Sequence, residues 1–181
     1  MKAINILLGF VFLSIMACKK DSSSNTQTTT STFEAYSTAF VNNGTFPKLY
    51  TCDSTGISPT VSWKNAPVGT NAYAITMHTI PPTGDKHVYI VLYNLPANLS
   101  SIAQGVSNTG VFGINTVNGK MSYTPPCSQG PGAKIYIITV YALSKQPVIS
   151  VAPSAVSMDV LLSAMSGITL GTSTITVSYT R

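Results

Sequence analysis

Short runs of β-branched and aromatic residues, separated by turn-forming residues, follow one another along most of the chain. Residues 72–78 (AYAITMH) alternate in the way expected of a half-buried strand. Residues 88–96 (VYIVLYNLP) and 134–143 (KIYIITVYAL) are apolar runs without internal glycine or proline, as is typical of central strands. Residues 58–63 (SPTVSW) and 173–181 (STITVSYTR) also alternate, and the latter predicts a strand with one solvated face. The pattern predicts a mostly β domain.

One segment near the C-terminus, SAVSMDVLLSAMSG, has the spacing of a helix instead. Its apolar residues between Val156 and Met165 recur at intervals that place them on one helical face. Ser154 or Ser157 is expected to cap the start of this helix, and Gly167 is expected to end it. We therefore predict one amphipathic helix.

The first eighteen residues, MKAINILLGFVFLSIMAC, differ from the rest of the chain. A lysine precedes an apolar run that is too short and too unevenly flanked for a membrane span, so residues 1–17 are predicted to be a signal peptide. The ending SIMAC resembles a bacterial lipobox, in which the cysteine sulfur is lipidated and Cys18 becomes the N-terminus. An ordinary signal peptide with an incidental cysteine is the alternative.

The residues that follow Cys18 are polar. Residues 18–32 offer no apolar side chain to a core, which predicts a lipidated cysteine on a disordered tether. Residues 33–181 are long enough for one domain with its own core. This arrangement predicts a protein anchored to a membrane of the bacterial cell envelope, with the outer membrane preferred and the domain facing the periplasm or the exterior.

Composition agrees with a β domain and limits its chemistry. Only 8% of the residues are charged. The formal net charge is +5, but three lysines precede the folded domain and the other basic residues are scattered, so we expect no nucleic-acid partner. There is no Gly-x-Ser-x-Gly, His-Glu-x-x-His or Cys-x-x-Cys motif, and two histidines do not make a metal site. We expect no enzyme, metal or cofactor; a hydrolase that uses His78 or His87 is the least favoured alternative.

Two pairs of residues share a strand face and are candidates for a pocket. His87 and Tyr89 are two residues apart, as are Lys134 and Tyr136. The alternatives are a surface histidine at a strand entrance for His87, a strand-end side chain for His78 and a solvated lysine for Lys134.

Cys52 and Cys127 are the only cysteines of the folded domain, and both lie in loop-like sequence. Because the lipobox places the domain outside the reducing cytoplasm, a disulfide between them is expected. By closing about 75 residues it would add about 4 kcal/mol in the chain-entropy model. Two free buried thiols are the alternative.

Several motifs follow one another through the folded domain in a recognisable order. They are FPKLYTCDSTGISPTVSW, APVGTNAYAITM, YIVLYNLPA, GIN, NG, PC, YIITVYAL and SYTR, and they cover nearly all of residues 33–181. This series resembles the phosphatidylethanolamine-binding protein family, in particular its bacterial Raf kinase inhibitor-like branch. The resemblance implies a large antiparallel sheet packed with a smaller one, a helix in the C-terminal region and a small surface pocket for anionic groups. Family members are usually described as binding or inhibitory proteins.

The sequence departs from the family at that pocket. HTIPPTG stands where the family has Asp-Pro-Asp-x-Pro, so both acids are lost. The family's two pocket histidines fall on Tyr89 and Lys134, with His87 two residues before the first. Pro125 stands where the family has a glycine, whereas the pocket tyrosine is kept as Tyr136.

The resemblance therefore implies a remodelled pocket, formed by Tyr89, Lys134, Tyr136, His87, His78 and Pro125. Lys134 would be its permanent cation, the tyrosines its hydroxyl donors and Pro125 a narrower rim. Our first hypothesis is a lipid-anchored envelope binding protein for a small anionic or polar ligand or a protein partner. The alternative is an interaction module, such as a protease or kinase inhibitor, with a vestigial pocket.

Overall fold

The structure, a computed structural model, describes residues 31–82 and 84–181. The predicted signal peptide, the predicted lipidation of Cys18 and nearly all of the predicted tether lie outside this range. Within the described residues, no helix is both long and apolar enough to cross a bilayer.

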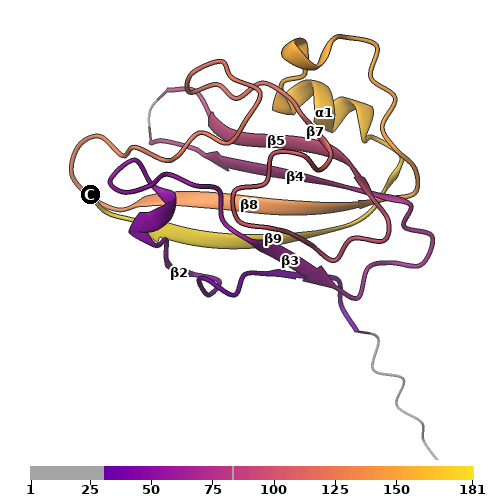
Figure 1. Ribbon diagram of the computed structural model, residues 1–181, viewed down its shortest axis with the longest axis horizontal. Helices are drawn as coiled ribbons and strands as arrows, with labels where there is room; N and C mark the ends of the chain where they lie inside the picture. Colours follow the sequence, from indigo (N-terminus) through magenta and orange to yellow (C-terminus); the bar gives the residue numbers. More distant parts are fainter. Residues whose placement is uncertain (1–30, 83) are drawn as a thin grey trace, which may run out of the picture. The chain divides into compact units, whose positions relative to one another are not determined.

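A six-stranded sheet is the largest element of the domain (Figure 1). Its strands are antiparallel except for the short parallel pair of β2 and β9. In spatial order they are β2 (Gly44–Thr45), β9 (Thr169–Tyr179), β8 (Lys134–Leu143), β4 (Ala72–Thr79), β5 (His87–Pro96) and β7 (Val111–Phe112). The predicted strands at 72–78, 88–96 and 134–143 form the middle of this sheet, because their apolar side chains fill both of its faces.

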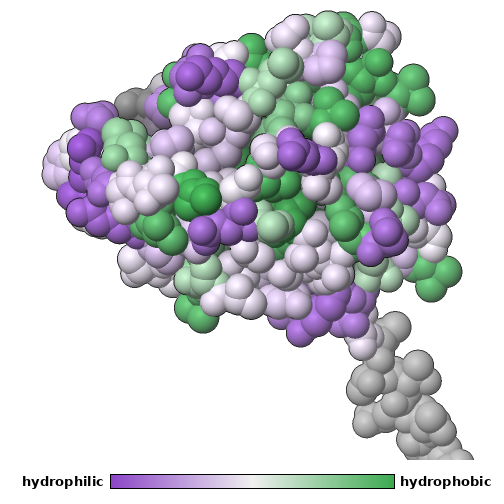
Figure 2. Space-filling view, viewed as in Figure 1, coloured by the Kyte–Doolittle hydropathy of each residue, from purple (hydrophilic) through white to green (hydrophobic). Residues whose placement is uncertain are grey.

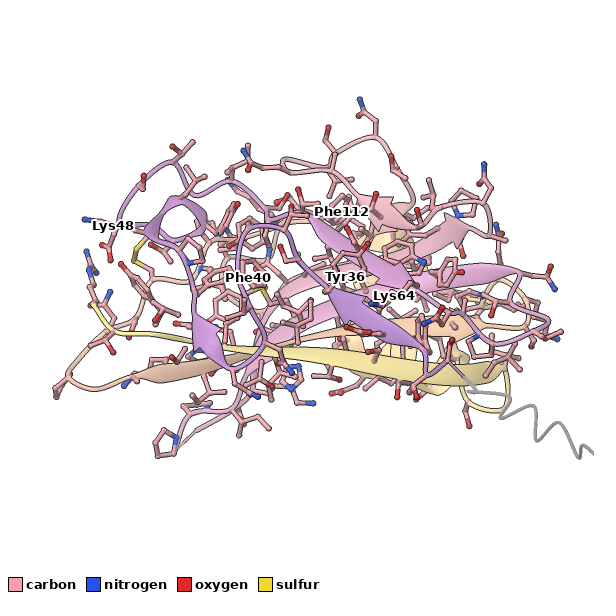
Figure 3. All side chains as sticks on the ribbon, turned by 90° about the horizontal axis from the view of Figure 1, so that it is seen from below. Tyr36, Phe40, Lys48, Lys64 and Phe112 are labelled. Atoms are coloured by element: carbon pink, nitrogen blue, oxygen red, sulfur yellow. A yellow bond between two sulfur atoms is a disulfide. The ribbon has the colours of Figure 1, made fainter. Side chains whose placement is uncertain are left out.

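A smaller sheet packs against the large one. Its three strands, in spatial order, are β1 (Glu34–Tyr36), β3 (Val61–Lys64) and β6 (Ser101–Ile102). Trp63 of β3 meets Tyr73 of β4, with ring centroids 4.9 Å apart, inside a core to which both sheets contribute. On the outside of β1, Figure 3 shows Lys64 beside Tyr36; the Lys64 Nζ lies 5.5 Å from the ring centroid and 3.0 Å from Glu34 Oε2. The predicted mostly β fold with two sheets is confirmed.

The predicted helix is present as α1 (Met158–Ala164), next to β5 (Figure 1). Ser157 caps it by accepting a hydrogen bond of 3.2 Å from the backbone N–H of Val160. Ser154 lies instead in η2 (Pro153–Ala155), one of two short 3₁₀ helices; the other is η1 (Lys48–Tyr50). Met158 and Leu161 bury the apolar face of α1, together with Met165 just after the helix, against the side of the large sheet that faces away from the small sheet.

Candidate ligand pocket

A cavity of about 430 Å³ opens where β4 ends and where β5 and β8 begin. These three strands meet there because β4 runs antiparallel to both neighbours. The volume is in the range of small-molecule sites. Its lining residues are Thr79, Ile80, Pro81, Pro82, His87, Tyr89, Cys127, Ser128, Gln129, Ala133, Lys134, Ile135 and Tyr136.

Two tyrosines form the inner wall of this cavity. The rings of Tyr89 and Tyr136 meet edge to face, with centroids 5.5 Å apart, and both side chains are buried. Burial raises the pKa of Tyr89, and the neighbouring Tyr136 raises it further. Burial likewise raises the pKa of Tyr136, with a smaller contribution from Tyr179. Both phenols therefore stay protonated at physiological pH and can donate hydrogen bonds to a ligand.

Lys134 brings a positive charge to the cavity. It is the first residue of β8, and its Nζ donates to the backbone oxygen of Pro131 over 3.2 Å. His87 lies at the corresponding position of β5 and is exposed. Among the described lining residues there is no acid. The site is therefore suited to a negatively charged or acceptor-rich ligand.

The loop before β8 contributes a hydroxyl without a partner. Ser128 is only 6% exposed, and its Oγ has no hydrogen-bond partner among the described residues. A buried, unsatisfied hydroxyl costs about 1–3 kcal/mol. A ligand atom that accepts or donates a hydrogen bond there would remove this cost.

The predicted disulfide between Cys52 and Cys127 is present and holds this loop in place. Next to it, the backbone N–H of Cys52 donates to the oxygen of Pro126 over 3.0 Å. The Arg181 Nε lies 2.8 Å from Asp53 Oδ1, and the Arg181 Nη1 lies 3.7 Å from Cys127 Sγ. Figure 1 marks the C-terminus at this end of the domain, and Figure 3 labels Lys48 there. Figure 2 shows many hydrophilic residues on the surface of this end.

Four of the six predicted pocket residues line the cavity together: Tyr89, Lys134, Tyr136 and His87. His78 does not, because alternate residues of a strand point to opposite faces and Thr79 is the one that faces the cavity. The Nδ1 of His78 is buried without a described partner, and burial, followed by the charge of Lys86, lowers its pKa.

Pro125 is also not brought to the cavity. Its ring packs against Gly56, where a Cβ atom would lie 3.0 Å from Pro125 Cγ. The expectation that Pro125 narrows the rim of the pocket is therefore wrong: its ring contacts residue 56 and does not line the cavity. The close approach, and a φ of +66°, explain why residue 56 is a glycine.

Sequence reasoning did not select several lining residues, namely Thr79, Ile80, Ala133, Ile135, Ser128 and Gln129. Ile80 carries a signal only in the structure, where it is a large apolar side chain left exposed beside a polar site. Ser128 and Gln129 are ordinary loop residues in the sequence, and only the folded loop turns them toward the cavity.

Residues 36–180 match the phosphatidylethanolamine-binding protein family. The chain belongs to this family. Three proteins that are similar to this chain are each named UPF0098 protein. That of Chlamydia trachomatis is 30% identical over 151 residues, covering 80% of this chain and 97% of the relative. That of Chlamydia muridarum is 32% identical over 149 residues, covering 79% of this chain and 95% of the relative. That of Aquifex aeolicus is 30% identical over 135 residues, covering 71% of this chain and 78% of the relative.

Two crystal structures resemble the family protein along most of its length. One is CT736 of Chlamydia trachomatis, described as a phosphatidylethanolamine-binding protein homologue. Its TM-score is 0.74 at 27% identity, and the match covers 82% of this chain and 97% of that one. The other is Escherichia coli YbcL, described as a member of the mammalian family, with a TM-score of 0.73 at 20% identity and coverage of 82% and 98%. The second likeness concerns the fold alone.

Proposed function

We propose that this family member is a lipid-anchored binding protein of the bacterial cell envelope, and that its altered pocket holds a small ligand with an anionic group. The observation that supports the ligand is the meeting of Lys134, Tyr89 and Tyr136 in one cavity that has no acid among its described lining residues. A cation and two protonated phenols in a partly enclosed site match the needs of an anion.

The pocket would bind its ligand through other side chains than a pocket built on aspartates and histidines. An aspartate beside a histidine tunes its protonation, and such a pair makes binding sensitive to pH. Here a lysine and a tyrosine stand in the two histidine positions that the family resemblance implies. Binding would then depend on a lysine and two hydroxyls, in a remodelled version of the family's site.

A thermal-shift screen of carboxylated and phosphorylated compounds tests this function. We expect some of these compounds to raise the melting temperature of the protein, and Lys134→Ala to abolish the shift. Lys145→Ala is the matched control, because Lys145 is exposed and follows the opposite end of β8. A shift that survives in Lys134→Ala would refute the assigned pocket.

The proposed anchor rests on the ending SIMAC before Cys18 and the polar sequence after it. Several acyl chains on one cysteine would hold the protein on a membrane almost permanently, since each buried methylene adds about 0.8 kcal/mol. Labelling of growing cells with a fatty-acid probe should mark the wild type and spare Cys18→Ser. Labelling of both would exclude lipidation at Cys18.

The cavity favours ligand binding over the two alternatives. An interaction or inhibitor module with a vestigial pocket would not need a lysine, two phenols and an unpartnered hydroxyl in one cavity. A hydrolase that uses His78 or His87 would need its histidine in the cavity beside a group that orients it. Only His87 lines the cavity, and there is no acid among the described lining residues. We therefore propose no catalytic role for this site.

A further inference from the structure

The cavity is lined by two chemically different groups of residues. The polar ones are Lys134, Tyr89, Tyr136, Ser128, Gln129 and His87. The apolar ones include Ile80, Pro81, Pro82 and Ala133. A ligand that fills this space meets both hydrogen-bond donors and aliphatic surface.

One of the apolar lining residues is unusually exposed. Ile80 is 64% exposed, although a large apolar side chain gains free energy when it leaves water. Its segment is held beside β8, because the hydroxyl of the preceding Thr79 donates to the backbone oxygen of Ile135. Ile80, Pro81 and Pro82 form an apolar edge beside the polar residues, and the body of a ligand would cover it.

Lys134 is the single permanent positive charge among the described lining residues. Two other cations near the site are already engaged: Arg181 lies 2.8 Å from Asp53, and Lys86 lies 3.6 Å from Asp159. Neither of them lines the cavity. One lysine balances one negative charge, and a dianion would keep an unbalanced charge in a partly enclosed site.

The hydroxyls around Lys134 favour a compact head with several acceptor positions. The Ser128 Oγ is buried without a described partner, and the Tyr89 and Tyr136 phenols face the same cavity. A carboxylate has two oxygens and about four acceptor sites, so it can accept from the lysine and from hydroxyls at the same time.

We infer that the pocket takes an amphipathic monocarboxylate, with its carboxylate at Lys134 and the adjoining hydroxyls and its acyl or aryl body along Ile80 and the neighbouring prolines Pro81 and Pro82. This inference rests on the proposed function of the same site and specifies its ligand class. It selects against a dianionic phosphate monoester with the same body.

Isothermal titration calorimetry of the purified protein at pH 8 tests the inference with three probes below their micelle concentrations. Octanoate has the proposed head and body, octyl phosphate has the same body on a dianionic head, and acetate has the head alone. We expect octanoate to bind at least tenfold more tightly than either of the others. Lys134→Met should abolish octanoate binding.

The apolar edge is tested separately with Ile80→Ser. We expect this variant to weaken octanoate binding severalfold, whereas Val148→Ser, at another exposed apolar residue, should not change it. The melting temperature of each variant is measured to check that it is folded. An equal loss in both serine variants would overturn the assigned apolar edge.

The possible results distinguish failure of the monocarboxylate inference from failure of the proposed function. If octyl phosphate binds as tightly as octanoate and still requires Lys134, the monocarboxylate inference is overturned and the proposed function stands. If no probe binds, or if Lys134→Met binds octanoate like the wild type, both are overturned.

Discussion

Lys134 is the residue on which the charge of the pocket mainly depends. It begins β8, its Nζ reaches the backbone oxygen of Pro131, and it lines a cavity whose described lining contains no acid. Its neighbours Tyr89 and Tyr136 remain neutral, since burial raises the pKa of each phenol. The charge of the site is therefore set mainly by one side chain, which makes single substitutions informative.

At the residue scale, His78 should make the protein sensitive to acid. Burial lowers its pKa below the ordinary value of 6.5, so below about pH 6.5 the unfolded state binds a proton that the folded state does not. The free energy of unfolding should decrease as the pH falls from 6.5 toward the lowered pKa. Urea titrations between pH 7.5 and 5 measure this loss, which should be smaller in His78→Gln. The same loss in both proteins would assign the acid sensitivity to other groups.

Gly56 gives a second prediction at this scale. An alanine there would have to adopt a φ of +66° and would place its Cβ 3.0 Å from Pro125 Cγ. Gly119→Ala is a matched control, because Gly119 has a φ of +72° but no heavy atom within 4 Å of a Cβ. The left-handed backbone costs about 1–2 kcal/mol at either position, so Gly56→Ala should lose more stability than Gly119→Ala. Equal losses in urea unfolding would show that the contact with Pro125 has no energetic effect.

At the scale of elements, the long strands and the helix were readable from the sequence. β8 has the predicted bounds, because its apolar run contains no glycine or proline. α1 lies within the predicted segment, because the helical spacing of its apolar residues continues over several positions. The strands β1, β2, β6 and β7 were not predicted. They have two or three residues each, and their pairing is decided by the neighbouring strand rather than by their own pattern.

The candidate site was predictable in part for the same reason. The spacing of two residues correctly brings His87 to Tyr89 and Lys134 to Tyr136, because each pair lies on a regular strand. The rest of the lining comes from the turn after β4 and the loop before β8, where backbone geometry decides the direction of each side chain. That geometry has no simple periodic signal in the sequence.

The loop before β8 gives a prediction at the element scale. Its Cys127 is bonded to Cys52, and the next two residues, Ser128 and Gln129, line the cavity. The double variant Cys52→Ser, Cys127→Ser should lose about 2–4 kcal/mol of stability, as is usual for a disulfide. It should also bind octanoate more weakly, because the loop that carries the two lining residues is no longer tied.

Thermal melts and calorimetry with and without reductant check this prediction. The reductant should lower the melting temperature and the affinity of the wild type and leave both values of the double variant unchanged. An affinity that is the same in the wild type and the double variant would show that the disulfide does not shape the pocket.

At the scale of the whole described domain, two sheets form a stable support and leave the site at one end. The core between the sheets includes Trp63 and Ile138, and α1 covers part of the opposite face of the large sheet. The cavity lies instead at the end where β5 and β8 begin, so its side chains can change while the core is kept. The altered pocket that we propose therefore requires no change in the core.

A crystal structure of the protein grown with octanoate would locate the ligand directly. We predict that the carboxylate lies within hydrogen-bond distance of Lys134 Nζ and of at least one of the Tyr89, Tyr136 and Ser128 hydroxyls. We also predict that the acyl chain lies against Ile80. Octanoate bound at another place, or bound with its carboxylate away from Lys134, would refute the assigned ligand site.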